Sequence, residues 1–141
     1  MIKNKNILIF GKRGFIGSHF YNTIKKNNNV YSFFSNNKKI DLDNYHKKKI
    51  DYIINKNKFD FILNFHAQTD IKFSNKNPNY DFYHNCSIVH SIINAMVNNS
   101  CRAFFLNFGT VTQIGYTNIK KKIKLNIAGK PQTIFDLHKQ Y

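Results

Sequence analysis

An apolar run that leads into three evenly spaced glycines constrains the fold of this chain more than any other feature. The segment reads Ile7-Leu8-Ile9-Phe10-Gly11-Lys12-Arg13-Gly14-Phe15-Ile16-Gly17-Ser18. The apolar run predicts a buried strand, and the residues after the glycines predict an amphipathic helix. A strand, a glycine-rich turn and a helix N-terminus together predict a phosphate-binding site, because free N–H groups and the positive end of the helix dipole face the anion.

Each glycine of this motif has its own expected role. Gly11 lets the chain turn sharply with a positive φ. Gly14 removes a side chain where the backbone must approach a pyrophosphate, and Gly17 lets the helix start pack closely on the strand. The alternative is a turn that only connects a strand to a helix. The motif's position after the first strand and at the start of a helix favours the phosphate site.

The spacing Gly-x-x-Gly-Phe-Ile-Gly-Ser over residues 11–18 resembles the extended short-chain dehydrogenase/reductase family. Most members of that family are NAD(P)-dependent nucleotide-sugar epimerases, dehydratases and 4-keto-reductases. The resemblance implies an α/β fold over residues 1–141, with a Rossmann-like doubly wound parallel sheet that is truncated after the fifth strand. The cofactor contacts that it implies in this motif are Gly11, Arg13, Gly14, Phe15, Ile16 and Gly17.

Composition indicates one globular domain, because 42% of its 141 residues are hydrophobic. No apolar run approaches the roughly 18 residues that a membrane span needs. No signal-peptide pattern opens the chain, so we expect a cytoplasmic protein without a membrane partner. Cys86 and Cys101 are too few for a disulfide framework and lack metal-ligand spacing. We therefore expect two reduced cysteines and no metal site.

The formal net charge of +15 invites a nucleic-acid interpretation. Of the 22 basic residues, however, only Arg13 and Arg102 are arginines. Lysine rises together with Asn, Ile, Phe and Tyr, which indicates a bias toward AT-rich codons. The lysines are scattered as solvated faces, and no aromatic-basic or helix-turn-helix motif accompanies them. We therefore expect no specific nucleic-acid partner, although weak binding to polyanions stays open.

The hydrophobic pattern predicts an alternation of strands and helices. Strands are expected at residues 7–10, 30–34, 59–64 and 103–107, with a short strand or turn at 39–42. Helices are expected from 15 to about 26, up to about 58, and from 77 to about 98. In the first helix, Ile16, Phe20 and Ile24 should face the sheet. The helix at 77–98 is apolar on more than one side, which suits a sheet on one face and a second subunit on the other.

The end of the strand at 30–34 should carry the residue that contacts the adenosine ribose. NAD sites place an Asp or Glu there, about 20 residues after the glycines, but residues 34–36 contain no carboxylate. Arg13 can point at the same place, which favours the 2′-phosphate of NADP over NAD. The alternative is that Arg13 is an exposed loop residue without this role. By resemblance Asp41 and Leu42 flank the adenine, and the alternative is that Asp41 caps a helix.

Residues 64–70 follow the strand at 59–64 and resemble the family segment in which small residues cross under the cofactor. Ala67 fits this pattern, and the resemblance makes it a cofactor contact. His66 does not fit, because the family has a small residue there. A single histidine at a strand end is typical of a packed or capping residue, so the sequence assigns no chemistry to His66.

The resemblance also implies a catalytic set in the C-terminal part of the chain. Thr110, in the segment 108–115, matches the hydroxyl residue that hydrogen-bonds the substrate oxygen. Lys139 matches the lysine of Tyr-x-x-x-Lys, which holds the cofactor ribose one helical turn from the tyrosine. Phe135 occupies the tyrosine position and has no proton to exchange. We expect His138 on a different helix face from Phe135, so the sequence offers no evident substitute.

Two functions remain open from the sequence. The first is a nucleotide-sugar epimerase, dehydratase or 4-keto-reductase that transfers hydride at a sugar carbon with NADP or NAD. Family members extend well beyond Tyr141 and include a substrate-binding region, so with Phe135 we expect this chain to be inactive alone. The alternative is a non-catalytic dinucleotide-binding module, a degraded gene product, or half of a split protein. A homodimer or a C-terminal partner chain is the expected assembly.

Overall fold

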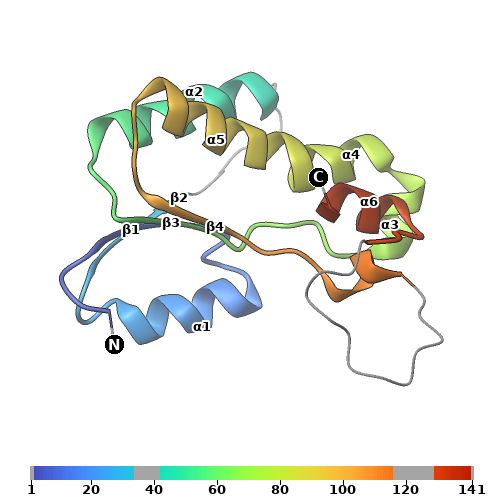
Figure 1. Ribbon diagram of the computed structural model, residues 1–141, viewed down its shortest axis with the longest axis horizontal. Helices are drawn as coiled ribbons and strands as arrows, with labels where there is room; N and C mark the ends of the chain where they lie inside the picture. The colour runs from blue at the N-terminus through green and yellow to red at the C-terminus, as the bar shows by residue number, and fades with distance from the viewer. Residues whose placement is uncertain (1, 34–41, 116–128, 141) are drawn as a thin grey trace. The chain divides into compact units, whose positions relative to one another are not determined.

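The computed structural model describes residues 2–33, 42–115 and 129–140 (Figure 1). The chain divides into two compact units. The sheet unit consists of Met1–Ala67 and Ser87–Phe108, and the helical unit consists of Gln68–Cys86 and Gly109–Tyr141.

The sheet unit contains a four-stranded parallel sheet with the order β2-β1-β3-β4. The strands are β1 (Asn6–Phe10), β2 (Asn29–Phe33), β3 (Phe61–Asn64) and β4 (Phe104–Asn107). This order confirms the doubly wound topology for the strands that the structure describes. The predicted strand or turn at 39–42 lies outside the described residues except for Leu42, which begins a helix.

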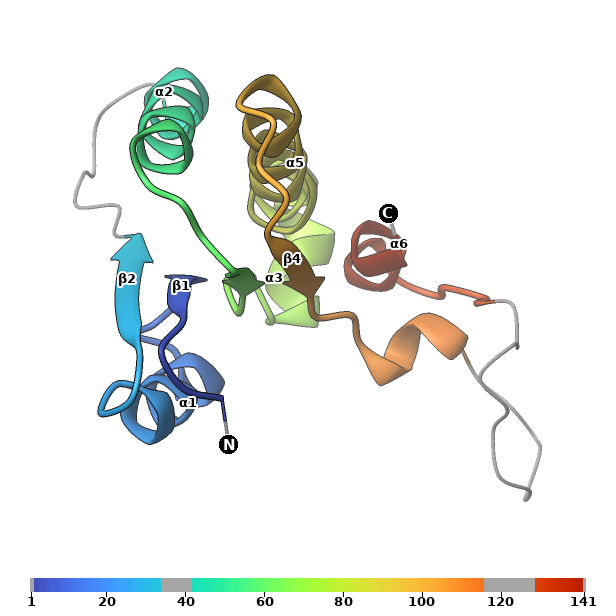
Figure 2. The same cartoon turned by 60° about the vertical axis from the view of Figure 1, so that its left-hand side comes forward.

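Helices cover both faces of this sheet (Figures 1 and 2). Helix α1 (Phe15–Ile24) lies on one face, and α2 (Leu42–Lys56) and α5 (Ile88–Asn98) lie side by side on the other. Successive side chains of a strand alternate between faces, and β1 is buried from Ile7 to Phe10, as a central parallel strand should be.

The core on the α1 face joins Ile24 to the inward side chains of β1 and β3. Phe20 packs against this cluster, as the helical spacing predicted. The prediction for Ile16 was wrong, because its side chain is 58% exposed. Ile16 lies in the first turn of α1, where the helix begins at the glycine loop, and it is not part of the core cluster.

The helical unit is built from short elements around α6 (Ile134–Gln140), which packs against α3 (Ile71–Lys76), α4 (Pro78–Phe82) and the 3-10 helix η2 (Val111–Ile114). The predicted single helix at 77–98 is wrong in one respect, because a π-helical turn, η1 (Tyr83–Ser87), separates α4 from α5. Sequence reasoning missed α3 and η2, since four to six residues are too few to show a helical period. The remaining local signal for α3 is its cap, where Asp70 accepts the N–H of Phe73.

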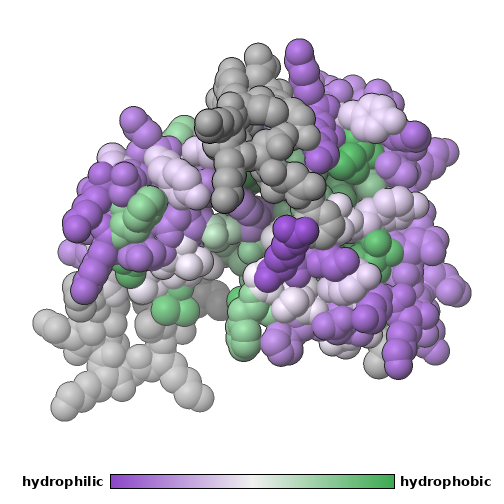
Figure 3. Space-filling model, turned by 180° about the vertical axis from the view of Figure 1, so that it is seen from behind, coloured by the Kyte–Doolittle hydropathy of each residue, from purple (hydrophilic) through white to green (hydrophobic). Residues whose placement is uncertain are grey.

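The surface agrees with solvated lysines on the described part of the chain. Lys25, Lys26, Lys47 and Lys48 are all exposed. The face in Figure 3 is largely hydrophilic, with hydrophobic residues in separate small patches. Among the described residues, no helix combines the length and apolar character that crossing a bilayer would require.

Candidate functional site

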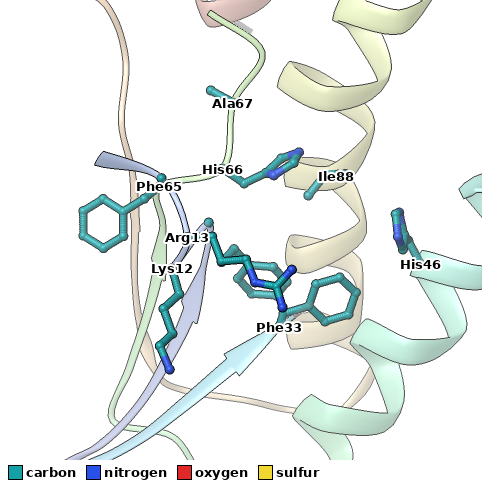
Figure 4. A pocket seen from close by; sticks show the side chains of 11 residues that line it. Lys12, Arg13, Phe33, His46, Phe65, His66, Ala67 and Ile88 are labelled. Atoms are coloured by element: carbon teal, nitrogen blue, oxygen red, sulfur yellow. The ribbon is translucent and has the colours of Figure 1, made fainter. Parts of the chain in front are cut away.

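A cleft of about 270 Å³ opens in the sheet unit where β1, β2 and β3 end (Figure 4). In the sheet order, β2 lies on one side of β1 and β3 lies on the other. The chain therefore reverses direction across the sheet between β1 and β3, which makes their ends a topological switch point. Open α/β sheets bind ligands at such points. No Asp or Glu of the described ranges lines the cleft. Its lining residues are Phe10, Gly11, Lys12, Arg13, Gly14, Phe33, His46, Phe65, His66, Ala67 and Ile88.

Two of the three glycines are required by the fold itself. Gly11 has φ +77°, and a Cβ there would lie 2.6 Å from the backbone nitrogen of His66. A Cβ on Gly17 would collide with the carbonyl oxygen of Gly11. The turn after β1 therefore needs Gly11 for its conformation and Gly17 for the close approach of α1 to the loop.

Gly14 differs, because a Cβ there would make one tight contact but no outright clash with the surrounding protein. It caps α1 with φ −71° and ψ 167°, and a Cβ would meet only the Gly11 carbonyl oxygen, at 3.3 Å. Among the described side chains none caps this end of α1, and the first helical N–H groups have no acceptor within the helix. Phe15 and Ile16 are 82% and 58% exposed and are not among the residues that line the cleft.

The two basic residues of the loop point in different directions (Figure 4). Lys12 extends away from the cleft, with its Nζ 3.6 Å from the centre of the Tyr21 ring. The guanidinium group of Arg13 instead reaches over Phe33, the last residue of β2. Arg13 thus lies at the strand end where the ribose contact is expected.

The structure does not describe the side chains of the other residues predicted to contact the ribose and the adenine. Residues 34–36 and Asp41 lie outside the described residues. Leu42 begins α2, but its side chain also lies outside the description.

The far wall of the cleft comes from the turn after β3. Asn64 is buried and donates from Nδ2 to Oδ1 of Asn107, 2.8 Å away on β4. Its own Oδ1 accepts the backbone N–H of His66 at 3.1 Å. With the backbone held this way, the His66 ring extends toward Ile88, and Ala67 follows along the wall (Figure 4).

Sequence reasoning did not identify His46 as a cleft residue. His46 lies on α2, is 4% exposed and packs edge-on against Phe33 with ring centres 5.6 Å apart. A histidine in the polar first half of a helix carries no signal that it will be buried. Its position depends on how α2 packs over the end of β2.

Thr110, Phe135 and Lys139 belong to the helical unit. The Thr110 hydroxyl caps η2: its Oγ1 accepts the N–H of Thr112 at 3.4 Å and lies 3.0 Å from Oγ1 of Thr112. The Gln113 side chain accepts the Thr110 N–H in return, at 3.4 Å. Thr110 is therefore positioned by a reciprocal cap.

Phe135 and Lys139 lie one turn apart on α6. The Phe135 ring is buried, at 6% exposure. Burial disfavours the charged ammonium of Lys139 and lowers its pKa, an effect that electrostatic interactions with nearby Cys86 and Asp81 partly offset. The helix therefore brings together the matched lysine and the phenyl ring at the tyrosine position.

A buried carboxylate, unexpected from the sequence, lies behind α6. Asp81 is fully buried, and its Oδ1 accepts hydrogen bonds from Ser74 (2.5 Å), Asn85 (3.0 Å) and Gln68 (3.1 Å). Its Oδ2 lies 2.7 Å from Nδ1 of His138. These donors satisfy a charge that would be costly to bury alone.

A cysteine of the π-helical turn is linked to the same region. Burial, together with the Asp81 charge, raises the pKa of the Cys86 thiol from 9.0 to about 11. The thiol donates to the backbone oxygen of His138 at 3.3 Å. Burial thus disfavours the thiolate of Cys86, which is the reactive form of the side chain. Among the described residues, no cluster of His, Cys, Asp or Glu could hold a metal ion.

A second cavity of about 200 Å³ lies in the helical unit beside the start of α6. Asp136 lines it and accepts the N–H groups of Gln132 (3.3 Å) and Thr133 (3.1 Å). Burial would raise the pKa of Asp136, but hydrogen bonds from Thr112, Thr133 and these N–H groups hold it below its usual value. Thr133 accepts the N–H of Asp136 in return, so the pair caps α6.

Comparison with known proteins identifies a matching protein family and several solved structures with a similar fold. The model of the NAD dependent epimerase/dehydratase family matches residues 7–141. No curated protein matches the sequence.

Three solved structures illustrate the likeness of fold. A UDP-N-acetylglucosamine 4-epimerase from Methanobrevibacter ruminantium M1, in complex with UDP-N-acetylmuramic acid, has a TM-score of 0.79 at 16% identity, over 99% of this chain and 48% of that one. A dTDP-4-dehydrorhamnose reductase from Bacillus anthracis, in complex with NADP, has a TM-score of 0.81 at 13% identity, over 99% and 48%. A UDP-glucose-4-epimerase from Stenotrophomonas maltophila, with bound NAD, has a TM-score of 0.77 at 17% identity, over 97% and 46%. The chain thus spans about half the length of these structures.

Proposed function

Because the chain belongs to the NAD dependent epimerase/dehydratase family, we propose that the cleft beside β1 and β3 binds a nicotinamide dinucleotide. The geometry of Gly14 carries this proposal: a Cβ there would make one tight contact with the Gly11 carbonyl oxygen but no outright clash, and the start of α1, which no described side chain caps, is open to a diphosphate. In this proposal Gly11 and Gly17 shape the loop, and the backbone N–H groups of Phe15 and Ile16 bind the anion while their side chains stay exposed to solvent. Ala67 lines the cleft with a small side chain. When bound, the nicotinamide ring supplies the hydride donor or acceptor.

We further propose that NADP is preferred over NAD. Arg13 supports this, because its guanidinium lies over the end of β2, and the cleft has no described carboxylate to accept a ribose 2′-OH. An arginine fork suits the 2′-phosphate. Asp41 and Leu42 are the proposed residues that flank the adenine.

The proposed substrate class is a nucleotide sugar, which family membership and the solved epimerases and reductase support. The reaction would be hydride transfer at a sugar carbon. Thr110 would hydrogen-bond the substrate oxygen, and the Lys139 ammonium would hold the nicotinamide ribose and stabilise negative charge near it. Hydride transfer at an oxygen-bearing carbon also needs a group that gives or takes the proton of that oxygen.

Phe135 favours a second candidate function, a dinucleotide-binding module that does not catalyse the reaction alone. A phenyl ring on α6 has no exchangeable proton where a tyrosine would supply one. In this proposal a second chain or a second copy completes the protein. The exposed side chains of Ile93 and Val97 on α5, at 45% and 72%, offer it an apolar surface.

Calorimetric titration of the chain with NADPH and NADH tests the binding proposal. Binding of both, with NADPH tighter, is expected, and binding of neither would contradict it. An assay of NADPH oxidation with a panel of UDP- and dTDP-linked 4-keto sugars separates the two functions. Turnover by this chain alone would exclude the non-catalytic module.

A further inference from the structure

We propose that His66 contacts the dinucleotide diphosphate and makes binding dependent on pH, tighter near pH 6 than near pH 8. This inference rests on the proposed function of the cleft and names a binding residue and a response to pH for that same site. From the sequence alone, His66 is interpreted as a packed or capping residue with no assigned chemistry.

The first observation is the place of His66 in the sheet. β1 pairs with β3 so that Phe10 is opposite Asn64. His66 follows Asn64 by two residues and therefore lies level with the glycine loop, on the β3 side of the switch point. Its backbone nitrogen would be 2.6 Å from a Cβ on Gly11, so the two segments touch. A diphosphate on this loop passes directly beside residue 66.

The second observation is the direction of the ring. The backbone N–H of His66 is already used, because it donates to Oδ1 of Asn64. The ring is a separate group that extends into the cleft toward Ile88 (Figure 4). The His66 side chain therefore lines the cleft, while its backbone N–H is bonded within the turn after β3. An imidazolium placed here can donate a charge-assisted hydrogen bond to a phosphate oxygen.

The other groups that line the cleft show why His66 should control the response to pH. Lys12 and Arg13 come from the loop, and the Lys12 ammonium lies over the Tyr21 ring. β2 and α5 contribute Phe33 and Ile88, which carry no charge. Among the described residues that line the cleft, the other histidine is His46 from α2, which is 4% exposed and packed on Phe33. Of the two histidines, His66 is the more exposed and the nearer to the loop in the sheet register.

The test is the dissociation constant of NADPH between about pH 6 and about pH 8, for the wild type and four variants. We expect wild-type affinity to fall about tenfold over this range, the size of one charge-assisted hydrogen bond. His66→Ala and His66→Gln should bind about tenfold more weakly at pH 6, with a flat profile. His66→Lys should bind tightly at both pH values. His46→Gln, the matched control, should keep the wild-type slope.

A second probe locates the contact. Adenosine 2′-monophosphate keeps the adenosine and the 2′-phosphate but lacks the diphosphate, so its affinity should be the same in the wild type and in His66→Ala. An equal loss with both probes would show a general disturbance of the cleft and would overturn the inference.

Three further results would also overturn it. These are a flat wild-type profile for NADPH, tighter binding by His66→Ala than by the wild type at pH 6, and loss of the slope in His46→Gln rather than in His66→Ala. If the wild type binds neither NADPH nor NADH at any pH, the proposed function fails. If NADPH binds but His66 has no effect, the inference about His66 fails alone.

Discussion

The imidazole Nδ1 of His138 lies 2.7 Å from the carboxylate Oδ2 of Asp81, within the helical unit. The pair joins α6 to α4, and the Asp81 side chain is fully buried. Three further donors, from Gln68, Ser74 and Asn85, complete the environment of the carboxylate. Asp81 is therefore the polar centre of the helical unit.

We expect Asp81→Ala to lower the free energy of unfolding by about 3–5 kcal/mol, because it leaves several buried donors without their acceptor. His138→Ala should cost less, about 2 kcal/mol, since three donors still satisfy Asp81. Urea denaturation measures both. As a control, Lys5→Ala removes one partner of the exposed Lys5–Asp60 pair and should have a much smaller effect. Equal effects of Asp81→Ala and Lys5→Ala would show that the buried network does not stabilise the fold.

Substitutions at two glycines of the loop should affect different properties, Gly14 cofactor binding and Gly17 the stability of the fold. Gly14→Val should keep a cooperative melt yet abolish NADPH binding. The φ at this position suits any residue, and the added Cβ would press on the Gly11 carbonyl oxygen at 3.3 Å without an outright clash, whereas the side chain would take up space in the cleft. Gly17→Ala should lower the melting temperature, because its Cβ collides with the Gly11 carbonyl oxygen. Calorimetric titration and thermal melts of both variants measure the difference. Wild-type affinity in Gly14→Val would refute the placement of the diphosphate.

Arg13 and Lys12 form a matched pair for cofactor preference. Arg13→Ala should weaken NADPH binding about tenfold or more, since one charge-assisted contact to the 2′-phosphate is lost, and leave NADH affinity unchanged. Lys12→Ala should change the preference little, because its ammonium lies over the Tyr21 ring and points away from the cleft. Fluorescence titration with both cofactors measures the ratio. An unchanged ratio in Arg13→Ala would leave NADP preference without a residue to explain it.

The raised pKa of Cys86 predicts a loss of stability at high pH. The thiol ionises near 9.0 in the unfolded chain and near 11 in the fold, because burial disfavours the thiolate. Between these values only the unfolded state gives up its proton, so the free energy of unfolding should fall as pH rises from 9 to 11.

Urea denaturation across this pH range checks the expectation for Cys86. Cys86→Ala should show a shallower fall in the free energy of unfolding than the wild type, and Cys101→Ala should keep the wild-type slope. The same slope in both variants would mean that the Cys86 thiol does not cause the pH dependence.

The sequence predicted those parts of the molecule that depend on local pattern. The β1 run and the positive φ of Gly11 follow from residue type and spacing along short stretches, and the doubly wound sheet follows from the family resemblance. The turn that carries His66 could not be predicted, because the Asn64 amide that accepts its backbone N–H is itself bonded to Asn107 on another strand. Long-range partners of this kind leave no local signal.

The Asp81 network was missed for the same physical reason. Its donors come from Gln68, Ser74, Asn85 and His138, which are brought together only when α3, α4 and α6 pack. In the sequence, Asp81 is one polar residue in an aromatic stretch. The π-helical turn and the six-residue α3 were missed because short elements show no period.

The most direct test of the dinucleotide site is a thermal melt of the purified chain, alone and with excess NADPH or NADH. A ligand that binds only the folded state, at 100 times its dissociation constant, stabilises it by about 2.7 kcal/mol, which is easily measured as a shift in Tm. We predict a cooperative melt that NADPH raises more than NADH does. A cooperative melt with the same Tm in the presence of either cofactor would contradict a functional dinucleotide site in this cleft.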